Sequence, residues 1–300
     1  MTKCLRHSFL QQNGFIHLAI KNLFSDTNDR QPCLNMSDED MSPAERPYND
    51  ILNRQIDEGA TQAARTARGL SLSSLAAGLF IGFGPLLMAV AHTIAADVYS
   101  EPTIRLLISF MYSVGFIFVV ISETDLYTEL DTRAAFPVFQ GQTPVSGLGR
   151  LYAFTIVFNV IGGIIASLVM VYIGTTYGFV EPTAFEHLAT VYTERSTWQL
   201  FLGSILAGWL MGLLAWLTIA ANGVGSRTFF VILVTAAIAF MHLPHSIAGN
   251  VEVFMGLLVD SPVTWFDWGR FLVASVIGNA IGGVVFVAVT AYGGRQRNDD

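Results

Sequence analysis

Two short segments, Asn159-Val-Ile-Gly-Gly163 and Asn279-Ala-Ile-Gly-Gly283, decide the fold of this chain, because they repeat one pattern 120 residues apart. Each lies inside a long apolar stretch. Small residues let helix backbones approach closely in lipid, so helix packing is one role of these glycines. Recurrence at a fixed offset also indicates an internal duplication, with one unit over about residues 72–174 and a second over about residues 197–292.

Six uncharged stretches run through the chain, and each is a candidate membrane span. A spanning helix needs about 20 mainly apolar residues, and the second stretch reaches that length only if its helix continues past Glu123. Three spans per unit is an odd number, so the two units must insert with opposite topology, a common plan for transporters and channels. The stretches are residues 69–96, 106–122, 151–180, 196–226, 228–251 and 271–294.

The composition fits an all-α integral membrane protein with six transmembrane helices in two inverted three-helix repeats. Of the 300 residues, 52% are hydrophobic and 13% are charged, whereas a soluble domain carries about a quarter charged residues. The chain has no glycine-rich phosphate loop and no basic patch of the kind that binds nucleic acid. We therefore expect no pumping ATPase, no nucleic-acid partner and no cofactor.

Polar residues interrupt the middle span of each unit. The first break reads Glu123-Thr-Asp-Leu-Tyr-Thr-Glu129 and the second reads His242-Leu-Pro-His-Ser-Ile-Ala-Gly-Asn250, so that Asp125 and His245 are again 120 residues apart. Non-helical backbone at membrane depth is tolerated only where protein buries it or where it lines a wet cavity. Two breaks that meet near the midplane predict a pore constriction, and a plain loop at the first break is the alternative. The residues expected to shape the breaks and repeats are Asp125, Pro244, Gly249, Asn250, Asn159 and Asn279.

The arginines near the span ends predict the orientation, because cytoplasmic loops carry an excess of basic residues. With the amino terminus in the cytoplasm, the outer loops hold only Arg105, Arg195 and Arg270. The inner face then holds Arg65, Arg68, Arg133, Arg150, Arg227, Arg295 and Arg297. We therefore expect a multi-pass protein of the inner membrane with both termini in the cytoplasm.

The segments outside the spans have their own predictions. Residues 1–47 are expected to form a disordered cytoplasmic leader because they show no sustained periodicity, and Met36 is a candidate for the true start. Residues 48–70 place apolar residues among charged ones at roughly helical spacing, which predicts an amphipathic helix on the inner membrane surface or, alternatively, a solvated linker. Residues 71–293 then form the channel domain, and residues 294–300 form a cytoplasmic tail.

These motifs together resemble the formate/nitrite transporter family over about residues 50–292. Asp125-Leu-Tyr-Thr128 is similar to the family's omega-loop pattern Asp-Leu-Phe-Thr, and His245-Ser-Ile-Ala248 is similar to the break in its fifth span. The two Asn-x-Ile-Gly-Gly segments are similar to its third and sixth spans. The resemblance implies a homopentamer in lipid, built of aquaporin-like protomers with interrupted second and fifth spans, each with its own pore and none with enzyme activity.

The resemblance also implies roles for individual side chains. In that family the central histidine and the omega-loop threonine face each other between two apolar constrictions, and by position these are His245 and Thr128. Ser246 follows the histidine and is taken as a further pore residue. The constriction on the cytoplasmic side would consist of Leu126, Phe116 and Tyr127, with Tyr112 on the periplasmic side.

The chain departs from the family pattern at several positions. Pro244 stands where the family has a glutamate before the histidine, and Gly249 stands where it has an asparagine, with Asn250 displaced by one residue. Gly208 occupies the position of an asparagine in the fourth span. The neighbouring vestibule lysine has no counterpart, and Arg195 is the nearest base. The substrate is therefore left open between a small monocarboxylate and an inorganic anion.

His245 suggests a mechanism for moving such a substrate. A bare anion in an apolar constriction has a desolvation cost of several kcal/mol or more. Because the unperturbed pKa of histidine is about 6.5, modest shifts change its charge near physiological pH. A cationic His245 would attract a carboxylate or nitrite and then donate a proton, so that a neutral acid crosses the second constriction. The Thr128 hydroxyl would orient the ring.

Three other classes of function remain open on the sequence. A membrane metalloenzyme could use His242 and His245 with Glu252, although Pro244 lies between the two histidines. A neutral-solute facilitator of the water or glycerol type shares the hourglass plan, but its Asn-Pro-Ala motifs do not occur in the chain. A membrane scaffold that transports nothing is the third.

Overall fold

A computed structural model describes residues 48–294 of the chain. The expected leader with Met36 and most of the expected tail, residues 295–300, lie outside the described residues. Within the described part, every regular element is helical, and six stretches are long and apolar enough to cross a membrane. The prediction of an all-α, six-span protein is therefore confirmed.

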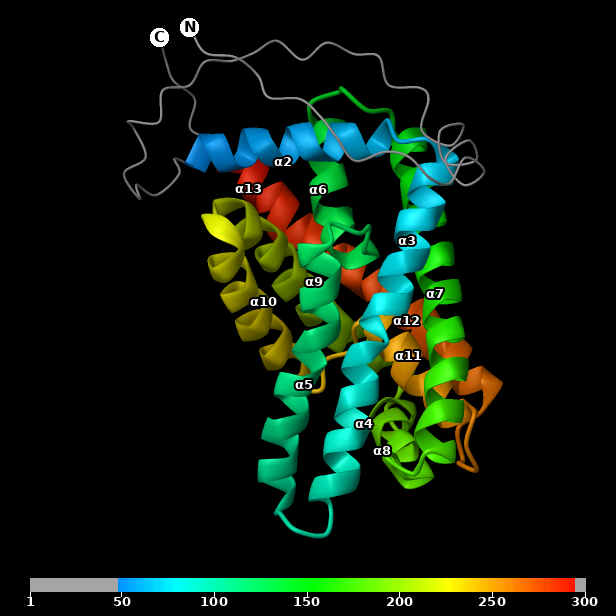
Figure 1. The fold of residues 1–300 in the computed structure, drawn as a ribbon. Coiled ribbons are helices and arrows are strands. Elements are labelled where there is room, and N and C mark those ends of the chain that lie inside the picture. Colours follow the sequence, from blue (N-terminus) through cyan, green and yellow to red (C-terminus); the bar gives the residue numbers. More distant parts are fainter. Residues whose placement is uncertain (1–47, 295–300) are drawn as a thin grey trace, which may run out of the picture. The chain divides into compact units, whose positions relative to one another are not determined.

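The six spans follow one another along the chain as in Figure 1. The first consists of α3 (Ala67–Ile81) and α4 (Phe83–Ala95), which meet at Gly82. The second, third, fourth and fifth are α5 (Glu101–Ile121), α7 (Val145–Thr176), α9 (Thr197–Ala220) and α10 (Gly223–Phe240). The sixth continues from α12 (Trp265–Gly283) through a π-helical turn, η1 (Val284–Val289), into α13 (Thr290–Gly293).

Two shorter helices continue the second and fifth spans after a break in the chain direction. α6 (Tyr127–Phe139) follows α5, and α11 (Ser246–Leu257) follows α10. Just after each of α5 and α10, one residue adopts a left-handed backbone conformation, with φ of 54° at Glu123 and 49° at His242. Such a conformation cannot continue a right-handed helix. The alternative of a plain loop at residues 123–129 does not hold, because its last three residues begin α6.

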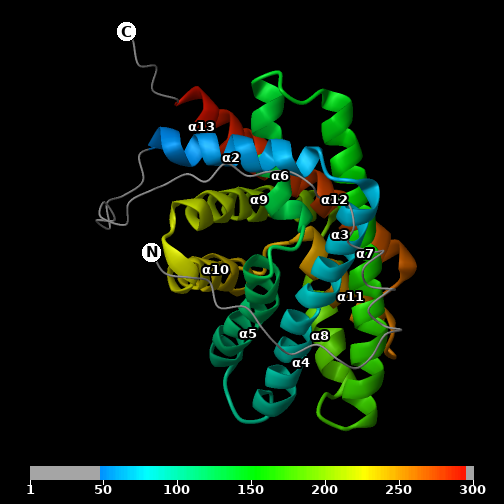
Figure 2. The ribbon, with the colours of Figure 1, turned by 45° about the horizontal axis from the view of Figure 1, so that its top comes forward.

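Two further helices lie at opposite ends of the bundle in both views (Figure 1, Figure 2). α2 (Tyr48–Ala63) crosses one end, and α8 (Pro182–Thr193) lies at the other. We call these the α2 end and the α8 end. α2 is amphipathic and buries Leu52 and Ile56 against Phe136 of α6. It stops at Ala63, so residues 67–70, which were expected in this helix, instead begin α3.

Glycines set how closely two pairs of spans pack. Where α9 crosses α12, a Cβ atom on Gly208 would lie 2.1 Å from the Asn279 carbonyl oxygen. Where α3 crosses α7, a Cβ atom on Gly78 would lie 2.2 Å from the Asn159 carbonyl oxygen. Both approaches are too short for any larger residue, and close backbone approach is the usual role of glycine between membrane helices. The glycine at position 208 is therefore a packing requirement of this chain.

Candidate functional site

The asparagine of the first repeated segment holds the first break in place. Asn159 accepts a hydrogen bond from the Tyr127 amide (2.9 Å) and donates to the carbonyl oxygens of Ser74 (2.7 Å) and Asp125 (2.9 Å). All three partners are backbone groups, and Asn159 is completely buried. The side chain thereby satisfies an amide and a carbonyl that the break leaves without helical partners.

The asparagine of the second segment does the same at the second break. Asn279 accepts from the Ser246 amide (2.8 Å) and donates to the carbonyl oxygens of Ser204 (2.8 Å) and Pro244 (3.1 Å). Asn159 and Asn279 therefore perform one function in two places. We call them the two asparagine clamps.

The hydrogen bonds of the two asparagine clamps align the two breaks one residue differently from the sequence spacing. The residues that cap the half-helices are Leu126 for α6 and His245 for α11. His245 is thus the counterpart of Leu126 at an offset of 119 residues, and Asp125 is the counterpart of Pro244. The spacing of 120 residues between Asp125 and His245 is not the structural register.

His245 and Thr128 meet at the junction of the two half-helices. The Nε2 atom of His245 lies 2.7 Å from the Thr128 hydroxyl, and both residues are completely buried. The Nδ1 atom accepts from the backbone amides of Ile247 (3.3 Å) and Ala248 (3.2 Å), so the imidazole caps α11. An acceptor at Nδ1 assigns the neutral tautomer with its proton on Nε2, which then donates to Thr128.

One row of side chains on α5 passes His245. Its members are four residues apart and therefore lie on one helix face, and all of them are buried. Phe116 packs edge-on against the His245 ring at 5.0 Å, and Tyr112 packs against Phe116 at the same distance. The row consists of Ile104, Ile108, Tyr112, Phe116 and Val120, and we call it the α5 row.

The α5 row ends in a cavity at each end of the bundle. Val120 lines a cavity of about 560 Å³ at the α2 end, and Ile104 and Ile108 line one of about 470 Å³ at the α8 end. Tyr112, Phe116 and His245 line neither cavity. Each cavity has charged residues in its lining, and a short buried segment lies between the two cavities. The middle of that segment holds the pair of His245 and Thr128.

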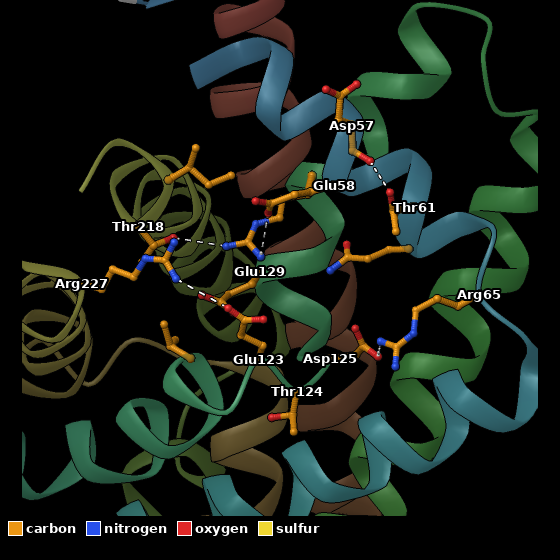
Figure 3. A pocket seen from close by; sticks show the side chains of 14 residues that line it. Asp57, Glu58, Thr61, Arg65, Glu123, Thr124, Asp125, Glu129, Thr218 and Arg227 are labelled. Atoms are coloured by element: carbon orange, nitrogen blue, oxygen red, sulfur yellow. Dashed lines mark hydrogen bonds and ion pairs between the residues drawn. The ribbon is translucent and has the colours of Figure 1, made fainter. Parts of the chain in front are cut away.

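The cavity at the α2 end is lined by three separate ion pairs (Figure 3). Arg65 pairs with Asp125 of the first break. Arg227 of α10 lies 3.7 Å from Glu123, and Arg133 of α6 lies 3.8 Å from Glu58 of α2. These pairs connect α2 and α10 to the first break and its half-helix.

The cavity at the α8 end is lined by basic and imidazole side chains. Arg195 donates to the His242 carbonyl oxygen at 2.6 Å, and the Arg105 guanidinium lies 5.6 Å from the centre of the Phe240 ring. His187 of α8 and His242 complete that lining, and Glu101 is its one acidic side chain. The cavity suits an anion better than a cation, because two fixed positive charges face one negative charge.

The other residues expected at the breaks have identifiable neighbours. Tyr127 donates to the Val276 carbonyl oxygen (3.2 Å) and packs edge-on against Tyr152, so its described partners lie on α12 and α7. Gly249 lies where a Cβ atom would be 2.3 Å from the Phe271 ring. The Asn250 amide oxygen accepts from the Trp268 indole at 2.9 Å, and the Ser246 hydroxyl is buried without a hydrogen-bond partner.

Two residues that line the cavity at the α8 end were not predicted as site residues from the sequence. Ile108 and Arg105 were missed, although the four-residue spacing of the α5 row is visible as a periodic apolar face. The partners of the metalloenzyme alternative do not come together: no group of three or more His, Cys, Asp or Glu side chains in residues 48–294 could hold a metal ion.

The chain is similar to known proteins both in sequence and in fold. The family model described as formate/nitrite transporter matches residues 49–293. The inner membrane protein YfdC of Escherichia coli is 28% identical over 248 residues, which cover 81% of this chain and 76% of that protein. A solved structure titled FNT family ion channel has a TM-score of 0.74 at 20% identity, covering 83% of this chain and all of its own. A pentameric formate channel with formate bound has a TM-score of 0.63 at 21% identity, covering 75% and 96%.

Proposed function

The chain belongs to the formate/nitrite transporter family, and on that premise we propose that it conducts small monovalent anions and their weak acids along the α5 row. The observation that carries the proposal is the buried pair of His245 and Thr128, 2.7 Å apart between two cavities that both have charged residues in their lining. A buried polar pair at membrane depth is energetically costly, so its presence points to a function. The formate bound to one structural relative supports a formate-like substrate.

The cap on α11 changes how His245 acts. A cationic ring needs a second proton on Nδ1, and that atom already accepts from the amides of Ile247 and Ala248. We therefore take the resting ring as neutral, in contrast to the cationic ring expected from the sequence. Its Nε2 proton is then the donor that an arriving anion meets, and the anion replaces the Thr128 hydroxyl as acceptor. Charging of the ring is favoured only while an anion is present to offset the charge.

The orientation expected from the arginines fits this arrangement. We assign the α2 end to the cytoplasm and the α8 end to the outside of an inner membrane. The Tyr48 hydroxyl at the start of α2 donates to the Ala291 carbonyl oxygen in α13, which brings the two ends of the described chain to the same side. The inner-membrane location named for the Escherichia coli relative supports an inner-membrane location for this chain.

Flux measurements on purified protein in liposomes test the function. We expect formate or nitrite to pass much faster than through protein-free liposomes. Acetate and lactate then define the upper limit of size, and hydrosulfide tests a smaller anion. Glycerol is expected to pass no faster than the control, because the buried segment offers a donor to an anion and no polar path for a polyol. Glycerol-driven swelling without anion flux would favour the neutral-solute facilitator instead.

We also infer a homopentamer in lipid, with one passage in each protomer. The fold neighbour with bound formate is pentameric, and spans α7 and α9 expose rows of large apolar side chains that lipid or a second protomer must cover. These side chains are Val157, Ile161, Ile165, Leu168, Leu202, Leu206, Trp209 and Leu213.

Native mass spectrometry of the detergent-solubilised protein checks the assembly. We expect a dominant species of five chains, because the exposed apolar rows on α7 and α9 bind best to a neighbouring protomer. Detection of monomers and dimers alone, under conditions that preserve a known membrane pentamer, would contradict it.

A further inference from the structure

Glu252 is a buried carboxyl group that the proposed transport path leaves unused. It lies in α11 and is 2% exposed. Its described hydrogen bond is with the Tyr192 hydroxyl of α8, 3.5 Å from Oε1. None of the ion pairs in residues 48–294 includes it. An ionisable residue at membrane depth without a charged partner is costly, and its retention points to a function.

The helix geometry places Glu252 beside the passage. Glu252 follows His245 by seven residues, which is two helical turns, so both lie on one face of α11 about 10 Å apart along the axis. On α5, Tyr112 lies one turn from Phe116, the residue that packs on His245. Glu252 bonds to Tyr192 of α8, and Ile104 and Ile108, which precede Tyr112 on α5, line the α8-end cavity. Glu252 and Tyr112 therefore lie on the same side of His245.

The groups around Glu252 support this placement. The Tyr112 hydroxyl is buried without a hydrogen-bond partner and lies in the neighbourhood of both Tyr192 and Glu252. Tyr192 in turn lies beneath Arg195, whose guanidinium is 5.9 Å from the centre of the tyrosine ring. Arg195 lines the cavity at the α8 end. A path of polar groups therefore leads from that cavity through Tyr192 to Glu252.

The other helices packed on α11 bring no charge to this carboxyl group. On α12, Asp267 and Arg270 interact with each other at 3.4 Å. On α4, His92 stacks on His187 of α8 at 4.2 Å. Among the described residues, the Tyr192 hydroxyl is the hydrogen-bond partner of Glu252, and no ion pair joins Glu252 to a helix packed on α11.

We propose that Glu252 is a second protonatable group of the passage, which admits anions to His245 when it carries a proton and repels them when it is ionised. This inference rests on the proposed anion transport. A proton from water in the α8-end cavity forms the O–H bond of the carboxyl group, and ionisation returns it to that water. In a low-dielectric segment, a fixed negative charge near the path of an anion raises the barrier steeply. Anion flux therefore falls as the pH rises through the ionisation of Glu252.

Anion flux into liposomes over a pH series from about 5 to about 9 tests this role. Glu252→Gln keeps the shape and the partner for Tyr192 but cannot ionise. Since the protonated fraction of the wild-type group falls about tenfold per pH unit above its pKa, the ratio of variant to wild-type flux should rise about tenfold per unit at the alkaline end. Because both proteins meet the same substrate protonation at each pH, the flux ratio cancels the effect of the substrate's own titration.

Two further variants complete the test. Glu194→Gln removes a carboxylate from an exposed position just after α8, and its flux ratio should stay flat across the series. Glu252→Met supplies a second uncharged side chain of similar length that buried sites tolerate, and it should reproduce the glutamine result. Wild-type flux with a flat ratio for both folded Glu252 variants would overturn the role of Glu252 alone. Absence of anion flux in the wild type at every pH would overturn the proposed function, and this inference with it.

Discussion

Replacing His245 with asparagine is expected to leave a folded, assembled protein whose anion flux falls about tenfold to a hundredfold. Asparagine is among the best residues at a helix N-cap, so its side-chain oxygen can accept from the Ile247 and Ala248 amides as Nδ1 does. The fold is therefore retained. The shorter side chain cannot bring a donor to the position of Nε2, 2.7 Å from the Thr128 hydroxyl.

The size of this effect follows from the lost hydrogen bond. A hydrogen bond to a charged group contributes about 1.5–3 kcal/mol, and each ~1.4 kcal/mol added to a barrier slows passage about tenfold. Asparagine also cannot titrate, so the residual flux should carry no proton with each anion. Simultaneous recording of anion uptake and internal pH in liposomes measures both quantities. The coupling of the two fluxes separates this role from the pH-dependent admission proposed for Glu252.

Matched variants show whether His245 acts through Thr128. Thr128→Val removes the hydroxyl and keeps the shape, and its effect should be non-additive with His245→Asn by about 0.5–3 kcal/mol, because the two groups share a hydrogen bond. His92→Asn changes a histidine that packs on His187 but itself lines neither cavity, and it should leave the coupling of anion and proton unchanged. A folded His245→Asn protein with wild-type flux and wild-type coupling would remove His245 from the mechanism.

Replacing Asn279 with leucine is expected to prevent stable folding. The side chain satisfies the Ser246 amide and the carbonyl oxygens of Ser204 and Pro244. Leucine is similar in size but leaves all three backbone groups without that partner at membrane depth, where no water replaces it. A buried backbone group without a partner costs about 1–3 kcal/mol. The total for three such groups is a large part of the free energy of unfolding of an ordinary protein.

The thermal midpoint and the yield of assembled protein after detergent extraction measure this effect. Asn159→Leu should behave alike, because it removes the other asparagine clamp. Asn250→Leu is the matched control: that asparagine is also completely buried, but its described hydrogen bond is to the Trp268 indole and not to a break. Loss of this hydrogen bond should lower the thermal midpoint less than loss of a clamp. Equal midpoints for the three variants would show that the clamps do not hold the breaks.

The sequence alone determined the architecture of this protein. The lengths and polarity of six apolar stretches predict six spans because a bilayer fixes the number of residues needed to cross it. The repeat of Asn159 and Asn279 indicated two related units, and Pro244 together with the polar residues after Ile121 marked where spans would break. These features depend on local composition and spacing, which a single chain displays without knowledge of its contacts.

Only the tertiary structure decided what the repeated residues do. The sequence pattern around Asn159 indicates a packing motif. Its role as a clamp is visible only in the fold, where the carbonyl oxygen of Ser74, 85 residues earlier, lies 2.7 Å from the Asn159 amide nitrogen. The same holds for Gly208, which occupies the position of an asparagine in the family pattern. A Cβ atom there would lie 2.1 Å from the Asn279 carbonyl oxygen, so the packing excludes any larger residue.

The one-residue correction of the break register and the neutral form of His245 also came from contacts. Both depend on which backbone amide meets which acceptor, at distances of 2.8–3.3 Å. The spacing of residues along a chain says which side chains share a helix face, but it does not say which other helix lies opposite that face. That choice is made by the packing of all the helices together, and it places His245 against Thr128, and Glu252 against Tyr192.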